Sequence, residues 1–137
     1  MKIRQTSLLL PYSKNLEILL QNRKKLKKKT SGDFGFFGGH LKEKENPYPA
    51  LKREIKEELG INIQNLKIKF FKEFKFKLKK EILNQFVFLC KIPVSKLKKI
   101  KAKKGKETIT NFQEVFKLDL SKTDKKILKN IKEYLMR

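Results

Sequence analysis

Three glutamates and an arginine fall within the eight residues REIKEELG at positions 53–60. On a helix, Glu54 lies three and four residues before Glu57 and Glu58, so the three carboxylates share one face. Like charges at this spacing cost about 0.2–0.5 kcal/mol per pair. The last helical turn disfavours each anion there by roughly 0.3–1 kcal/mol more. Because this arrangement destabilises a free helix, we expect the carboxylates to have a cationic partner.

Two kinds of partner fit these charges. Arg53 lies at i, i+4 from Glu57 and lysines are abundant elsewhere, which is typical of a solvated charged face. A divalent cation fits equally well, because hard cations such as Mg2+ take oxygen ligands and tolerate several carboxylates at close range. The charges alone leave both interpretations open.

The segment just upstream, FGFFGGHLKEKE at 34–45, favours the metal. Its glycines let backbone approach a ligand and offer carbonyl or amide groups to it. These glycines are Gly35, Gly38 and Gly39, and we expect them in a loop beside the acidic helix. Glu43 and Glu45 bring further carboxylates to the same neighbourhood.

The helix that carries the acids has clear limits in the sequence. Asn46 suits the N-cap, Pro47 the first helical position, and Gly60 the residue that ends the helix. Apolar residues recur at i, i+4 and i+8 and predict a buried stripe. They are Leu51, Ile55 and Leu59.

Strand patterns precede and follow this helix. Residues 3–12 and 15–23 predict a hairpin, 71–79 alternate as a half-exposed strand, and 82–92 predict its neighbour, buried on both faces. Residues 112–118 predict the last strand. The basic segment 24–33 predicts a mobile loop, and the basic segment 94–106 a connection with a short helical turn.

The chain ends in an amphipathic pattern over 121–135. Ser121 suits its N-cap, and its apolar residues share one face. They are Ile127, Leu128, Ile131 and Leu135. The order of strands, helix, strands and helix predicts an α/β fold with a mixed sheet between helices.

Length and composition indicate one globular domain over 1–137. Hydrophobic residues make up 39% of the chain, which argues against disorder. Cys90 is the only cysteine and suits a buried position in a cytoplasmic protein. No apolar run approaches the roughly 20 residues needed to cross a bilayer, so we expect no membrane association.

The formal net charge is +22, which ordinarily indicates a polyanionic partner. Of the 36 basic residues only four are arginines, whereas phosphate and base recognition depends strongly on the bidentate guanidinium. The lysine excess therefore has two explanations, a biased genome composition or attraction of phosphorylated molecules.

The sequence resembles a Nudix hydrolase of the MutT-like type. The family signature is G, five residues, E, seven residues, then R-E-apolar-x-E-E-x-G-apolar. The residues that fill its specified positions here are Gly39, Glu45, Arg53, Glu54, Ile55, Glu57, Glu58, Gly60 and Ile61. The resemblance implies an α/β/α sandwich whose helix holds Mg2+, with Mn2+ as a substitute, and whose reaction is hydrolysis of a diphosphate linkage.

The resemblance also assigns roles to residues of the motif. Glu57 and Glu58 resemble the main metal ligands, Glu54 a further ligand or the base that activates water, and the Gly38 carbonyl another ligand. Glu45 and Arg53 resemble the pair that braces the loop against the helix. The motif glycine Gly39 and the strand-end residue Arg23 are assigned to substrate binding, Arg23 to a phosphate.

A further metal-binding glutamate often precedes the final strand in MutT-like members. Glu107 suits this role here, with Glu114 as an alternative, and an exposed surface charge is the competing interpretation for each. The chain departs from the family pattern at Phe37, which replaces a proline, and at Lys44, which replaces a glycine. His40 is expected to face solvent or to support the site indirectly.

The resemblance leaves three functions open. The preferred hypothesis is a pyrophosphohydrolase of nucleoside triphosphates or nucleoside diphosphate-X compounds, with removal of 8-oxo-dGTP-type nucleotides favoured. The alternatives are a pyrophosphohydrolase of RNA 5′ ends and a nucleotide sensor that does not cleave. Candidate base contacts, for which core or surface roles compete, are Asp119, Phe36, Phe37 and Gln85. Monomer and homodimer both fit.

Overall fold

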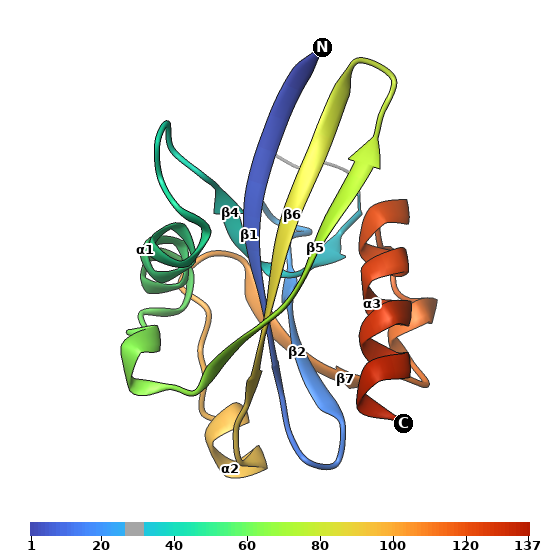
Figure 1. Cartoon of the computed structure of the whole chain (residues 1–137). Helices are drawn as coiled ribbons and strands as arrows, with labels where there is room; N and C mark the ends of the chain where they lie inside the picture. Colours follow the sequence, from blue (N-terminus) through green and yellow to red (C-terminus); the bar gives the residue numbers. More distant parts are fainter. Residues whose placement is uncertain (27–31) are drawn as a thin grey trace.

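A mixed sheet organises the residues that the computed structural model describes, 1–26 and 32–137 (Figure 1). Seven strands of these residues form it, in the order β3-β2-β1-β6-β5, with β4 paired to β1 and β7 paired to β2. The strands are β1 (Lys2–Tyr12), β2 (Glu17–Asn22), β3 (Phe34–Gly35), β4 (Phe37–His40), β5 (Ile68–Lys77), β6 (Glu81–Lys91) and β7 (Lys106–Asn111). The pair β1–β6 is parallel and the other pairs are antiparallel.

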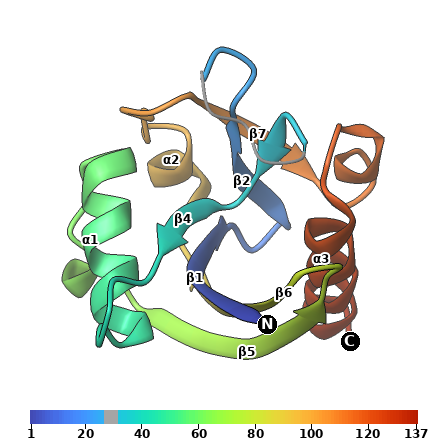
Figure 2. The ribbon, with the colours of Figure 1, turned by 90° about the horizontal axis from the view of Figure 1, so that it is seen from above.

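Two helices cover opposite faces of the sheet, α1 (Pro47–Leu59) and α3 (Lys122–Leu135), as Figure 2 shows from above. Alternation along β1 supplies both interfaces, because neighbouring strand residues point to opposite faces. Leu8 and Leu10 pack in the cluster that contains Ile127 and Ile131 of α3. Leu9 packs in the other cluster, with residues of α1. The predicted α/β/α sandwich is confirmed.

The hairpin of β1 and β2 is confirmed, but the two strands pair only next to the turn that connects them, at Tyr12 and Ile18. Farther from the turn, the edge of β1 that faced β2 pairs with β4, while β2 pairs with β3 and β7. The short strands β3 and β4 therefore lie next to different partners, although one residue separates them in the chain.

The acidic helix runs as the sequence predicts. Asn46 is its N-cap, although its side chain accepts no capping hydrogen bond, and Pro47 begins it. Gly60 ends it in the left-handed conformation with φ of 70°, which glycine adopts without steric cost. The predicted stripe Leu51, Ile55 and Leu59 is buried.

The C-terminal helix is also confirmed. The Ser121 hydroxyl accepts a hydrogen bond from the Asp124 N–H, as an N-cap does. Ile127, Leu128 and Ile131 are buried, and Leu135 is half-buried against the same cluster. The short helical turn predicted in the basic connection is α2 (Val94–Leu97), and the short 3-10 helix η1 (Ile63–Asn65) follows α1.

The prediction of a last strand over 112–118 is wrong. The last strand is β7, whose β-branched centre Thr108–Thr110 pairs with β2. Asn111 ends it, because its side-chain oxygen accepts hydrogen bonds from the N–H groups of Gln113 and Glu114 and turns the chain. Residues 112–118 form this turn and the short 3-10 helix η2 (Val115–Lys117).

Three smaller predictions need correction or lie outside the structure. The glycine segment is not a loop, because Gly35 belongs to β3 and Gly38 and Gly39 belong to β4. Strand β6 is buried on both faces only over Val87–Cys90, because the residues of its first half alternate between half-buried and buried. Residues 27–31 of the predicted basic loop lie outside the described residues.

No helix in the part of the chain that the structure describes is long and apolar enough to cross a membrane. The buried position predicted for Cys90 is confirmed, and burial raises the pKa of its thiol to about 11. A thiol with this pKa stays protonated at neutral pH and behaves as a small apolar group.

Candidate active site

Arg53 connects the acidic face of α1 to the segment before the helix. Its Nε and Nη2 atoms donate to the two carboxylate oxygens of Glu45, at 3.1 and 2.8 Å. Nη1 donates to Glu54 at 2.7 Å, and Nη2 also donates to the His40 carbonyl at 3.0 Å. A single guanidinium therefore ties β4, the loop after it and α1 together, which a lysine could not do with one ammonium group.

We call these hydrogen bonds of Arg53 with Glu45, Glu54 and the His40 carbonyl the Arg53 clamp. They shift the pKa values of the groups that form them. The Arg53 hydrogen bond and, next, the Lys42 N–H lower the pKa of Glu45 to about 2, while the pKa of Arg53 is raised, mainly by Glu45. Both groups stay ionised across the physiological range. The predicted pairing of Glu45 with Arg53 is thus present in the structure.

The three glutamates of α1 differ in exposure. The Glu54 side chain is 16% exposed, Glu57 is 46% exposed, and the whole Glu58 residue is 8% exposed. Glu57 lies 4.0 Å from Arg53 Nη1 and 3.8 Å from Lys104 Nζ. Glu57 therefore retains rotational freedom at the surface, whereas Glu58 is fixed inside.

Glu58 is a buried carboxylate next to another acid. Burial raises its pKa to about 7, the Gly38 N–H opposes this, and the charge of Glu54 raises it further. The Gly38 N–H donates to Glu58 Oε1 at 2.7 Å. One backbone N–H does not offset the desolvation of a full negative charge, so this carboxylate favours a nearby cation.

Strand β4 has no room for a side chain where it meets these acids. A Cβ on Gly39 would stand 2.5 Å from Cδ of Glu54. A Cβ on Gly38, whose φ is 139°, would stand 2.0 Å from the Ser7 carbonyl oxygen. The two glycines thus bring the β4 backbone directly against the Glu54 and Glu58 carboxylates.

Arg23, just after the end of β2, is half-buried. Its Nε donates to Gln21 Oε1 and its Nη2 to the Phe36 carbonyl, both at 3.0 Å. Its charge lowers the pKa of Glu58 on α1 and of Asp124 on α3. A Cβ on Gly35 would stand 2.4 Å from Arg23 Nη2, so the absence of a side chain there gives the guanidinium its place.

Glu107 is on the final strand β7, not in a loop before it, because the strand begins at Lys106. Its Oε1 atom accepts from the Ala102 N–H at 2.7 Å, which lowers its pKa. The residues after Ala102 reach α1, since the N–H groups of Lys103 and Lys104 donate to the Glu58 carbonyl. Glu107 is therefore connected to the end of α1 through segment 102–104.

Glu114 and His40 have other surroundings. Glu114 is exposed beyond β7 and pairs with Lys117 at 3.0 Å. His40 is exposed, and desolvation lowers its pKa, while its carbonyl supports Arg53. Glu107, not Glu114, lies with the candidate site.

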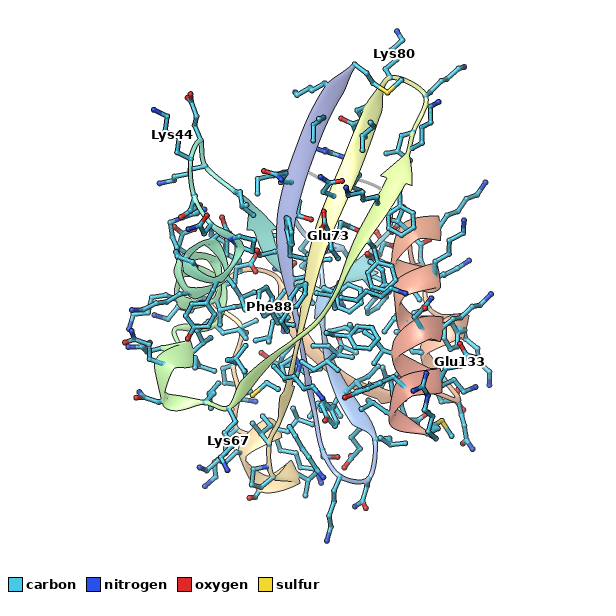
Figure 3. The ribbon with its side chains drawn as sticks, viewed as in Figure 1. Lys44, Lys67, Glu73, Lys80, Phe88 and Glu133 are labelled. Carbon is cyan, nitrogen blue, oxygen red and sulfur yellow. The ribbon has the colours of Figure 1, made fainter. Side chains whose placement is uncertain are left out.

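The structure also places the residues that depart from the family pattern and three of the candidate base contacts. Lys44 stands on the loop before α1 (Figure 3) and has φ of 62°, the left-handed conformation that favours the glycine of the family pattern. Phe36 and Phe37 are buried in the two core clusters. Asp119 is exposed, and its side chain accepts from the Asp33 N–H.

The side chains of this site are of the type that binds a divalent metal ion, although their carboxylates do not lie close together. Among the described residues, no three acidic, histidine or cysteine side chains lie close enough together to hold a metal ion. The donors are nevertheless hard oxygens, and the desolvation of Glu58 outweighs the favourable effects of the Gly38 N–H, Arg23 and Lys104 on its charge. Glu57 is exposed enough to turn toward Glu54 and Glu58.

Comparison with known proteins agrees with the fold and the motif. A family model described as the NUDIX domain matches residues 2–131. The chain therefore belongs to the Nudix family, and by this membership it is a pyrophosphohydrolase. Nudix enzymes generally use divalent metal ions and act on small nucleotide-type substrates. No curated protein sequence matches the chain.

Solved structures share the fold at low identity. A MutT protein from Methanosarcina mazei is 15% identical with a TM-score of 0.77, over 99% of this chain and 97% of that one. The E. coli dihydroneopterin triphosphate pyrophosphohydrolase is 14% identical with a TM-score of 0.73, over 95% and 97%. A C. elegans Ap4A hydrolase is 16% identical with a TM-score of 0.70, over 96% and 98%.

The sequence did not single out two buried polar residues around Arg23. Gln21 is 3% exposed, accepts from Arg23 and donates to the Lys104 carbonyl. Asp124 is 6% exposed, and burial raises its pKa to about 6. No sequence pattern marked Gln21 as a site residue, because a polar residue near the end of a strand is ordinary. Asp124 follows Ser121 at the spacing of a helix cap, which concealed its burial.

Proposed function

We propose that the chain is a Mg2+-dependent pyrophosphohydrolase that cleaves a diphosphate linkage in a nucleoside triphosphate or a nucleoside diphosphate-X compound. Removal of 8-oxo-dGTP-type nucleotides is the favoured activity, and Mn2+ substitutes for Mg2+. The observation that carries the proposal is the Arg53 clamp, which holds Glu54 beside Gly39 and next to buried Glu58. In this acidic site Glu54 and Glu58 are held in place, whereas exposed Glu57 can move.

The residues that would hold the metal are Glu54, Glu57, Glu58 and the Gly38 carbonyl, with Glu107 at the border of the site. A bound divalent cation would neutralise phosphate oxygens and lower the pKa of a bound water. Glu54 also suits the role of base, because the ion pair with Arg53 fixes its position. Arg53 and Glu45 would orient the acids, Arg23 would bind a substrate phosphate, and Gly39 would contribute to substrate binding.

The test is a substrate panel with product analysis. Purified protein with Mg2+ is supplied with nucleoside triphosphates, 8-oxo-dGTP, dinucleoside polyphosphates and nucleotide sugars, and phosphate, pyrophosphate and nucleotide products are separated. We expect turnover of at least one compound and its loss in Glu57→Gln and Glu58→Gln variants that keep the fold. The absence of any product across the panel would rule out the proposal and favour a sensor that binds nucleotides without cleaving them.

RNA 5′ ends are a second candidate substrate. The favouring observation is the charge of edge strand β5, which has lysines at positions 69, 72, 75 and 77 and one glutamate. A basic edge attracts a polyanion and repels a second copy of itself. This candidate predicts release of pyrophosphate from triphosphorylated RNA and a steep fall of RNA affinity with added salt.

A further inference from the structure

Lys104 lies at the edge of the candidate active site, on the connection between α2 and β7. Its Nζ atom lies 3.8 Å from Glu57 Oε2. Burial raises the pKa of Glu58 to about 7, and the charge of Lys104 is among the effects that oppose this rise. Lys104 is therefore a cation that acts on two of the three acids of α1.

The backbone of Lys104 is held on several sides. Its carbonyl accepts a hydrogen bond from Nε2 of buried Gln21 at 3.0 Å. The N–H groups of Lys103 and Lys104 donate to the Glu58 carbonyl, at 2.6 and 3.4 Å. Gly105 follows with φ of 66°, and a Cβ there would stand 2.5 Å from a backbone oxygen at the end of β2. The Lys104 side chain therefore starts from a fixed point beside the end of α1.

The side chain of Lys104, in contrast, is held weakly. It is 57% exposed, its partner Glu57 is 46% exposed, and their separation of 3.8 Å is longer than a direct hydrogen bond. An ion pair this exposed contributes little to stability. A fixed backbone that carries a loosely held ammonium group suits the binding of a ligand better than it suits a structural ion pair.

The preceding residue, Lys103, has a different place. A Cβ on Gly60 would stand 2.6 Å from Lys103 Cε and 2.9 Å from its Nζ, so this side chain packs on the residue that ends α1. A cation at the C-terminus of a helix interacts favourably with the helix dipole. Lys103 therefore has a structural position at the helix end, and it offers a control of equal charge for Lys104.

Glu57 cannot keep Lys104 as its partner and also serve the metal site. When Glu57 turns toward Glu54 and Glu58, the Lys104 ammonium group loses this partner. It then lies beside the site that would bind a diphosphate. A hydrogen bond from an ammonium group to a phosphate oxygen is charge-assisted and roughly twice as strong as a neutral one.

We propose that Lys104 is a further substrate-binding residue, which neutralises Glu57 in the metal-free protein and binds a phosphate oxygen of the substrate when Glu57 turns to a metal ion. The inference rests on the proposed function, because it takes Glu57 as a metal ligand and a diphosphate as the substrate. It gives one side chain two opposite effects. Lys104 competes with the metal ion for Glu57, and it favours binding of the diphosphate.

The variant Lys104→Met tests both effects, because it keeps an unbranched side chain and removes the charge. Calorimetry gives the Kd of Mg2+ without substrate, and the Kd of methylenediphosphonate, whose P–C–P linkage resists hydrolysis, at saturating Mg2+. We expect the Kd of Mg2+ to fall about twofold to fivefold. We expect the Kd of methylenediphosphonate to rise about tenfold.

Kinetics on a substrate that the panel identifies give a third measurement on Lys104→Met. KM should rise about tenfold while kcat changes less than about twofold, as expected for a contact that is equally strong in the ground state and the transition state. Thermal unfolding without metal should be nearly the same as for the wild type, because the ion pair that is lost is exposed.

Two further variants separate a local contact from general charge. Lys103→Met removes the same charge from the preceding residue and should change neither Kd by more than about twofold. Lys104→Arg keeps a cation at the same backbone position and should bind methylenediphosphonate like the wild type. Equal effects of Lys103→Met and Lys104→Met would reduce the role of Lys104 to surface charge and would overturn the inference.

The outcomes also distinguish this inference from the proposed function. Neither Kd requires turnover, so a wild-type protein that cleaves nothing in the panel rejects the proposed function, while the two Kd values still decide the role of Lys104. Turnover by the wild type together with an unchanged KM and an unchanged methylenediphosphonate Kd in Lys104→Met would uphold the proposed function and reject the inference. Weaker Mg2+ binding by Lys104→Met would contradict the competition for Glu57.

Discussion

Arg53 and Glu45 form a two-point contact across the start of α1, with hydrogen bonds of 3.1 and 2.8 Å between the guanidinium and the two carboxylate oxygens. The same guanidinium donates to Glu54. A change at Glu45, nine residues before Glu54 in the chain, therefore affects the acid proposed as base or metal ligand. Planar bidentate geometry makes this contact specific for arginine.

Replacement of Arg53 by lysine should reduce kcat by about 10- to 100-fold, which is typical when a residue that orients metal ligands is lost. Lysine keeps the charge but cannot reach Glu45, Glu54 and the His40 carbonyl at once. The measurement is steady-state kinetics at saturating Mg2+, with circular dichroism to verify the fold. Lys52→Arg, one position away and outside the clamp, is the control, and an undiminished kcat in Arg53→Lys would exclude a positioning role.

The adjacent glycines of β4 should respond differently to the same substitution. Gly38→Ala should lower the free energy of unfolding by about 2–4 kcal/mol, because its φ is 139° and its Cβ would stand 2.0 Å from a backbone oxygen that cannot move away. Gly39→Ala should cost less than about 1 kcal/mol, since its Cβ meets the mobile end of Glu54, but it should displace that carboxylate and abolish turnover.

Urea unfolding and kinetics on the two glycine variants measure both effects. Each variant is the control for the other, because both add a single methyl group to the same strand. Equal losses of stability, or a fully active Gly39→Ala, would contradict the close approach of β4 to Glu54.

Asp124→Asn should stabilise the protein at neutral pH. Burial raises the pKa of Asp124 from 3.8 to about 6, against the opposing Arg23 charge and Ser121 hydrogen bond. The folded state then binds more protons than the unfolded state between these values, so the stability that this group contributes is present at low pH and lost as pH rises to about 6. The difference in unfolding free energy between Asp124→Asn and wild type should therefore grow by about 2 kcal/mol from pH 4 to pH 7.

Urea titrations at several pH values measure this difference. Taking the difference cancels groups common to both proteins, including Glu45, whose lowered pKa acts in the opposite direction. A difference that stays constant with pH would show that Asp124 titrates near its ordinary pKa.

Mg2+ should raise the thermal stability of the wild type, because a ligand that binds only the folded state stabilises it. At a concentration about 100-fold above Kd, the expected gain is about 2.7 kcal/mol. Glu57→Gln should abolish most of this gain while leaving the metal-free protein nearly unchanged, since the Glu57 side chain is 46% exposed and has only distant ion pairs. Glu114→Gln is the matched control, because Glu114 is exposed and outside the site. Equal gains in both variants would remove Glu57 from the ligand set.

Much of this molecule is predictable from local pattern. The bounds of α1 follow from Asn46, Pro47 and Gly60, and the N-terminus of α3 follows from Ser121, because caps and helix-ending residues act through backbone geometry near in sequence. The pairing of Arg53 with Glu45 was implied by the resemblance to Nudix hydrolases and is present in the structure.

The last strand shows where local pattern fails. Residues 112–118 predict a strand, yet β7 lies just before them because Thr108–Thr110 can pair with β2 and Asn111 turns the chain. Strand identity depends on an available partner, which is distant in sequence. The same shift moved Glu107 from the expected loop onto a strand.

The sequence by itself determined the acidic helix, its clamp and its family, because these depend on residue type at fixed spacing within 23 positions. Only the tertiary structure decided burial. It made Glu58 a desolvated acid and Glu57 an exposed one, and it brought the charge of Arg23 to act on both Glu58 and Asp124. It also left the Thr6 hydroxyl and Gln85 Oε1 without a hydrogen-bond partner among the described residues. Desolvation and unpaired hydrogen bonds arise from elements that meet across the sheet, and no spacing along one strand or helix encodes them.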